Sequence, residues 1–146
     1  MKQSEGVERM IGADLRAFIE SALDRQFISA EDVRLLQTDI LSTGLSCKAQ
    51  AEALLALDRA VPSDASWEPV LTSLVVDFVV QSRGAAGMVE HDDALWLATV
   101  LDVGGPTRTA MGIAYAVLDR SLHVGAALLD FIMRGRHLER QQGIAA

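Results

Sequence analysis

Apolar residues recur along most of this chain at the three- and four-residue spacing that is typical of one helix face. The clearest example is V-L-T-S-L-V-V-D-F-V-V, from Val70 to Val80, where one stripe is formed by Leu71, Leu74, Val75, Phe78 and Val79. Further valines carry apolar character onto the other faces, and a helix that is apolar nearly all round is normally buried. We therefore predict that this segment is the buried central helix of an all-α protein.

The same periodicity predicts six further helices, and no segment shows the period-2 alternation of a strand. The first covers about residues 7–24, the second follows a capping signal at Ser29 and Asp32, and the third runs from an N-cap at Ser46 to Pro62. The fifth begins near Glu90, the sixth follows the breaker at residues 104–106, and the seventh spans residues 121–133. The predicted fold is a compact bundle of about seven helices.

The length of 146 residues suits one domain. We assign residues 1–135 to a single all-helical domain. From residue 136 the apolar pattern is lost, and residues 136–146 are predicted to form a frayed C-terminal tail.

A weak internal repeat relates two parts of the chain. When the sequence is displaced by sixty-one positions, apolar and acidic residues coincide: Ile28, Glu31, Asp32, Leu36 and Ile40 fall on Val89, Asp92, Asp93, Leu97 and Leu101. The shared pattern is a helix, a short turn, an apolar residue and an acidic helix start. We interpret it as two pseudo-symmetric helical-hairpin units around the central helix.

Composition and charge narrow the classes of partner. The formal net charge is −7, which disfavours nucleic acid and anionic lipid because both require a basic surface. The single cysteine, Cys47, indicates a reducing compartment, and no segment predicts a signal peptide or a membrane span. We therefore expect a cytoplasmic protein. The mean hydropathy of +0.23 is high for a small domain, so we expect a second copy to cover an apolar face, on the last two predicted helices.

The densest group of candidate metal ligands is Glu90, His91, Asp92 and Asp93 at one helix start. One interpretation is a divalent-cation site. The alternative is that the acids interact with the helix macrodipole and the free N–H groups, since four consecutive helical residues point in different directions and do not converge.

Asp77 is the one charged residue within the predicted central helix. A buried carboxylate must find donors or shift its pKa. Asp77 is therefore either an acid in a cleft, or a structural acid that bonds a neighbouring helix end or lies on the one exposed edge of its helix, with Arg83 or Arg108 as a candidate partner. Catalytic signatures are otherwise lacking around Cys47 and around the remaining histidines, His123 and His137. A small basic end, formed by Arg134, Arg136 and Arg140, is interpreted as a solvated tail that could contact an acidic partner.

Residues 87–97, G-M-V-E-H-D-D-A-L-W-L, place an aliphatic residue two positions after a glycine and an acid four positions beyond it. This segment resembles the TerB-like family, named for bacterial tellurite-resistance proteins. The resemblance extends over about residues 14–101, with a weaker copy at residues 44–55. It implies a compact, pseudo-symmetric helical fold, a bacterial source and a stress-related role.

The resemblance also implies divalent-metal binding by loops of the pattern Asp-Gly-x-Ile-x-x-x-Glu. The leading Asp is absent at all three matching places, where the chain has Arg25, Thr43 and Ala86. Because a cation such as calcium requires roughly six to eight oxygen ligands, several of them charged, these departures weaken the implied metal function.

We therefore predict a non-enzymatic helical interaction or sensing module without a cofactor, whose partner is another protein or a second copy. The alternative is a divalent-metal-binding protein with Glu90, His91, Asp92 and Asp93 as ligands. An enzyme that uses Asp77 as its acid or base is the third hypothesis.

Overall fold

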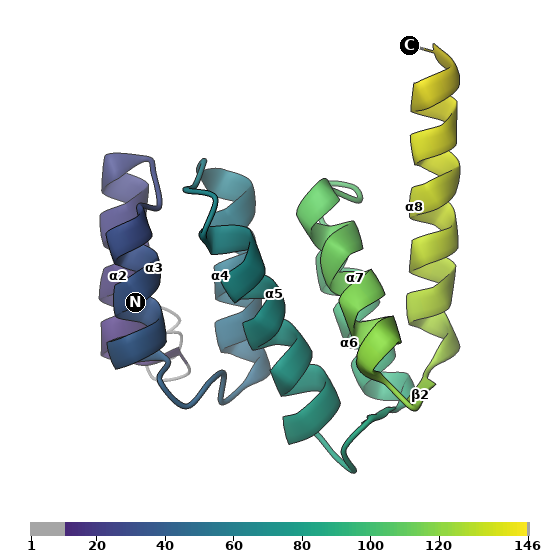
Figure 1. Ribbon diagram of the computed structural model, residues 1–146, viewed down its shortest axis with the longest axis horizontal. Coiled ribbons are helices and arrows are strands. Elements are labelled where there is room, and N and C mark those ends of the chain that lie inside the picture. Colours follow the sequence, from purple (N-terminus) through teal and green to yellow (C-terminus); the bar gives the residue numbers. More distant parts are fainter. Residues whose placement is uncertain (1–10, 146) are drawn as a thin grey trace, which may run out of the picture. The chain divides into compact units, whose positions relative to one another are not determined.

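The computed structural model describes residues 11–145, with side chains as far as residue 141 (Figure 1). Over this range the chain has seven α-helices, and the predicted all-α class is confirmed. The chain divides into two compact units, and the division falls between Val75 and Val76, inside the predicted central helix. The single domain predicted for residues 1–135 thus comprises two helical units.

The first unit contains α2 (Ala13–Arg25), α3 (Ala30–Leu35), the π-helical turn η1 (Leu36–Ile40), α4 (Lys48–Ala60) and the beginning of α5 (Trp67–Asp77). The predicted capping box is confirmed: the Ser29 hydroxyl accepts the Asp32 N–H at 3.1 Å, and the Asp32 carboxylate accepts the Ser29 N–H at 2.9 Å. The N-cap of α4 is Cys47 rather than the predicted Ser46. Ser46 instead donates its N–H to the Gln50 side chain, at 2.8 Å.

The second unit continues from α5 through the π-helical turn η2 (Phe78–Ser82), β1 (Met88–Val89), α6 (His91–Leu101), α7 (Arg108–Arg120), β2 (His123–Val124) and α8 (Ala126–Ala145). The two strands pair in parallel and were not predicted. They are too short to show a period in the sequence. The last helix also differs from prediction, because it begins at Ala126 and extends through residues 136–145, where we expected a tail.

The internal repeat agrees with the element positions in both units. An isolated parallel bridge joins Ile28 to Ser63, and sixty-one positions later the β1–β2 ladder joins Val89 to Val124. The same displacement carries residues 30–40, which form α3 and η1, onto residues 91–101, which form α6. It also carries Gln26, the only described non-glycine residue with a positive φ, onto Gly87, whose φ is 83°. The repeated unit is therefore a structural one.

The predicted central helix is α5 together with η2. Its buried side chains are Trp67, Leu71, Val75, Val76, Phe78, Val79 and Val80. The helix is not buried all round, because three residues spaced four apart, Pro69, Ser73 and Asp77, form an exposed edge.

Candidate functional site

The four predicted metal ligands lie at the start of α6. Glu90 is the N-cap and is exposed, as are His91 and Asp92. Asp93 is half-buried, and its carboxylate accepts hydrogen bonds from the Arg83 guanidinium at 3.4 Å. No three His, Cys, Asp or Glu side chains between residues 11 and 141 are placed to share a metal ion. Metal binding by this segment stays a prediction.

Arg83 connects the end of η2 to the start of α6. Its guanidinium lies 5.7 Å from the centre of the Phe78 ring while it bonds Asp93. The Phe78 ring in turn meets Trp96 of α6 edge-on, with 6.1 Å between ring centres. The cation–π contact and the aromatic pair hold the Arg83 guanidinium in place beside Asp93. Asp93 therefore has a structural role, because its carboxylate already pairs with a positive charge of the same chain.

Asp77 lies on the exposed edge of α5, with 61% of its side chain accessible. Its carboxylate is 3.4 Å from an Arg120 guanidinium nitrogen, so the expected partners Arg83 and Arg108 were wrong. The hypothesis of a catalytic acid rested on burial of this carboxylate, and the structure shows it in contact with solvent.

The remaining candidates are distributed over several elements. Cys47 is half-buried at the start of α4, and His123 is exposed on β2. His137 lies on the exposed side of α8, 3.1 Å from the Gln141 side-chain nitrogen. The predicted basic end belongs to α8 rather than to a tail: Arg134 pairs with Asp102 at 3.4 Å, and Arg136 donates to the Tyr115 hydroxyl at 3.3 Å. The structure does not bring these groups together into one site.

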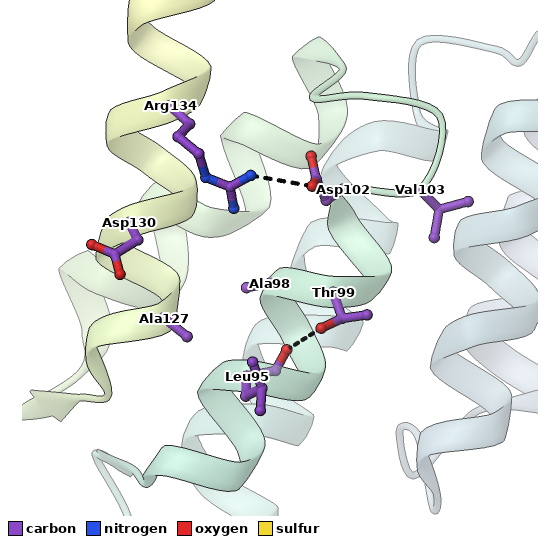
Figure 2. A pocket seen from close by; sticks show the side chains of 8 residues that line it. All are labelled: Leu95, Ala98, Thr99, Asp102, Val103, Ala127, Asp130 and Arg134. Atoms are coloured by element: carbon purple, nitrogen blue, oxygen red, sulfur yellow. Dashed lines mark hydrogen bonds and ion pairs between the residues drawn. The ribbon is translucent and has the colours of Figure 1, made fainter.

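A pocket of about 510 Å³ lies between α6 and α8 (Figure 2). Small residues, Ala98 and Ala127, face it from the two helices, and the Arg134–Asp102 ion pair crosses one end. Thr99 of α6 and Asp130 of α8 also line it (Figure 2). The pocket is an apolar groove with charged groups at its margin.

Large apolar side chains are exposed on both sides of this groove, where Leu95 and Val103 line it and those of α8 lie beside it without lining it. Leu95 and Val103 are each 49% accessible on the α6 side, and Leu129 and Met133 are 40% and 68% accessible on α8. Together with the two alanines they define the α6–α8 face: Leu95, Ala98, Val103, Ala127, Leu129 and Met133.

The first unit offers an internal comparison for the α6–α8 face. Sixty-one positions earlier, the six corresponding residues are all polar: Arg34, Gln37, Ser42, Ser66, Glu68 and Thr72. Buried positions in the same segments are apolar in both units, since Leu128 and Ile132 correspond to Trp67 and Leu71, and all four are buried. The repeated unit therefore does not require apolar residues on this face, and they are particular to the second unit. The same sixty-one-residue displacement of the sequence, applied to these six positions, shows the change from polar to apolar residues.

Comparison with known proteins adds no functional information. No known protein family, curated protein or solved structure matches this chain. None of the helices in the described part is long and apolar enough to cross a membrane. A functional argument therefore rests on the geometry of the chain.

Proposed function

We propose that this protein is a non-enzymatic helical interaction module that binds a protein chain through the α6–α8 face. The observation that carries the proposal is the change from six polar residues in the first unit to six apolar ones in the second. Apolar side chains that are scattered singly over a surface need no explanation, but apolar side chains that gather in a groove, as Leu95, Val103 and Ala127 do here, are typical of an interaction site. The resemblance to the TerB-like family suggests that the module acts in a stress response.

The shape of the groove supports a helix as the bound element. An amphipathic helix commonly binds in an apolar groove between two helices, and its contacts come from apolar side chains spaced three and four residues apart. The small side chains of Ala98 and Ala127 allow a close approach at the floor, and Leu95 and Val103 supply apolar contacts at the rim. The charged margin, with Asp102, would orient the partner rather than supply most of the affinity.

Site-specific photo-crosslinking in the source cells tests the proposal. A photoreactive amino acid replaces Leu95 or Met133 on the face, and Arg34 or Thr72 at the corresponding positions of the first unit. We expect the two face positions to give one defined adduct with a protein, identified by mass spectrometry, and the two matched controls not to give it. Equal labelling from both units, or no defined adduct from the face, would contradict the proposal.

A substitution that makes the second unit like the first provides an independent check. Leu129→Glu introduces on α8 the residue that the first unit has at Glu68. Because Leu129 is 40% accessible, the substitution should leave folding largely intact. We expect the adduct formed from Met133 to be lost in the Leu129→Glu background while the melting temperature changes little.

A further inference from the structure

We propose that the chain bound at the α6–α8 face is a second copy of this protein, held by antiparallel pairing of α8 with its equivalent. This inference rests on the proposed function, since it names the partner of the same face. It predicts a symmetric dimer in which both copies use the same residues.

The outward side of α8 carries a seam of four residues spaced three, four and three apart: Asp130, Met133, His137 and Arg140. All four are exposed. Residues at this spacing lie along one line of a helix, as in the contact line of paired helices. The seam begins with an acid, ends with a base and has its exposed apolar residue between them.

The order of charges selects the direction of pairing. When two copies of the seam run antiparallel, Asp130 of each copy lies opposite Arg140 of the other, and Met133 lies opposite His137. When they run parallel in register, like charges meet at both ends. Because opposite charges attract and like charges repel across an interface, the seam favours the antiparallel arrangement, which also opposes the two helix macrodipoles.

Other contacts of α8 leave the seam accessible. The opposite side of the helix packs inward through Leu128, Phe131 and Ile132. Within the described part of the chain Arg134 is the α8 side chain with an ion-pair partner, Asp102, whereas the seam residue Asp130 has none. Asp130 also lines the groove between α6 and α8 (Figure 2), so the seam begins at the α6–α8 face and continues along α8.

Apolar contact would come chiefly from the middle of the seam. Met133, at 68% accessibility, is the most exposed large apolar residue among the described side chains of α8, and Leu129 flanks it one turn earlier. A helix pair of this size, with polar residues at both ends of its contact line, belongs among small interfaces. We therefore expect a dimer with a dissociation constant in the micromolar range.

Sedimentation equilibrium of the full chain from about 1 to about 200 µM tests the inference, because a micromolar dimer passes from mostly dissociated to mostly assembled over that range. We expect Asp130→Arg and Arg140→Asp each to weaken self-association by about tenfold or more, since each replaces two attractive pairs with two repulsive ones. Asp39→Arg, at an exposed position in the first unit, is the charge-matched control and should leave the dimer unchanged.

Mixing the two charge variants gives the decisive readout. A heterodimer of Asp130→Arg with Arg140→Asp restores an opposite-charge pair at both ends of the seam, although each variant alone repels itself. Native mass spectrometry of the isotopically distinguished mixture should show heterodimer in excess of either homodimer. Changes within one helix cannot produce this result, because the pairs exist only between copies.

Two outcomes would overturn the inference. One is a chain that stays monomeric to about 200 µM, and the other is a dimer that neither charge variant weakens. A monomeric chain whose Met133 crosslinks to a different protein would remove the second copy as partner and leave the proposed function standing. A monomeric chain without a defined crosslink would remove both.

Discussion

Gly125 lies where α8 begins, at a close approach to α6. An ideal Cβ at this position would be 2.9 Å from the Ala94 Cβ, 3.1 Å from the His91 Cα and 3.4 Å from the Glu90 carbonyl oxygen. Carbon atoms in favourable contact are about 3.5–4.0 Å apart. Two of these three atoms belong to the backbone, which cannot rotate aside as a side chain does. Gly125→Ala therefore forces the two helix starts apart.

The magnitude follows from two opposing effects. Overpacking of a close contact lowers the free energy of unfolding by about 1–3 kcal/mol. Replacing glycine with alanine restricts the unfolded chain, which raises the free energy of unfolding by about 0.4–1 kcal/mol. The φ of Gly125 is not positive, so alanine adds no backbone strain. We expect Gly125→Ala to lower the free energy of unfolding by about 1–2 kcal/mol, which corresponds to a fall of about 2–6 °C in melting temperature.

Gly84→Ala is the matched control. No heavy atom lies within 4 Å of an ideal Cβ there, and the φ of Gly84 is likewise not positive. Only the effect on the unfolded chain remains, so we expect Gly84→Ala to raise the free energy of unfolding by about 0.4–1 kcal/mol. Urea denaturation of both variants and the wild type gives the comparison. A Gly125→Ala variant as stable as Gly84→Ala would refute the close approach of α6 and α8.

Four further predictions concern individual groups of the protein. Burial raises the pKa of Asp58, although the Trp67 indole N–H donates to its carboxylate at 3.0 Å, so stability is lost as pH rises through the raised pKa. Asp58→Asn keeps a hydrogen-bond acceptor for Trp67 but removes the charge. Urea denaturation should therefore show a higher free energy of unfolding for the variant at pH 7 but not at acid pH. An equal effect of the substitution at the two pH values would contradict this. Ser29→Ala should cost about 1 kcal/mol in the same assay by removing a cap. Partial burial opposes ionisation of Asp32, but hydrogen bonds from Arg25 and Ser29 outweigh it and lower the pKa of Asp32, so its contribution should be lost as pH falls below the usual carboxyl range. Millimolar divalent cations should leave the melting temperature unchanged because Asp93 is paired with Arg83; a metal-specific rise that Asp93→Asn abolishes would favour the metal alternative.

Local signals were read correctly from the sequence. The capping box at Ser29 and Asp32 involves residues three apart, so its chemistry is complete within one turn. In α6 the apolar residues that recur at helical spacing are all buried, namely Ala94, Leu97, Ala98 and Leu101. A helix imposes a fixed angular spacing on its side chains, so the apolar period identifies which of them share a face.

Other predictions failed where distant segments decide the outcome. The β1–β2 pairing joins Met88 to His123, and neither strand is long enough to leave a pattern. Leu129 belongs to the predicted last helix and is 40% accessible, because periodicity shows which residues are apolar and not how much of that face a neighbour covers. For Asp77 the sequence left a cleft and an exposed helix edge as alternatives, and the packing of α5 leaves it on the exposed edge.

The sequence by itself determined the all-α class, most helix positions, the capping box and the sixty-one-residue repeat, because each depends on spacings of a few residues or on similarity between two segments. Only the tertiary structure decided which apolar residues stay exposed. It separated Leu128, which is buried, from Leu129 and Met133, which are not. It also showed that Asp93 is paired and Asp77 accessible. Exposure and pairing depend on which helices pack together, and that packing is settled by contacts between residues far apart in the chain.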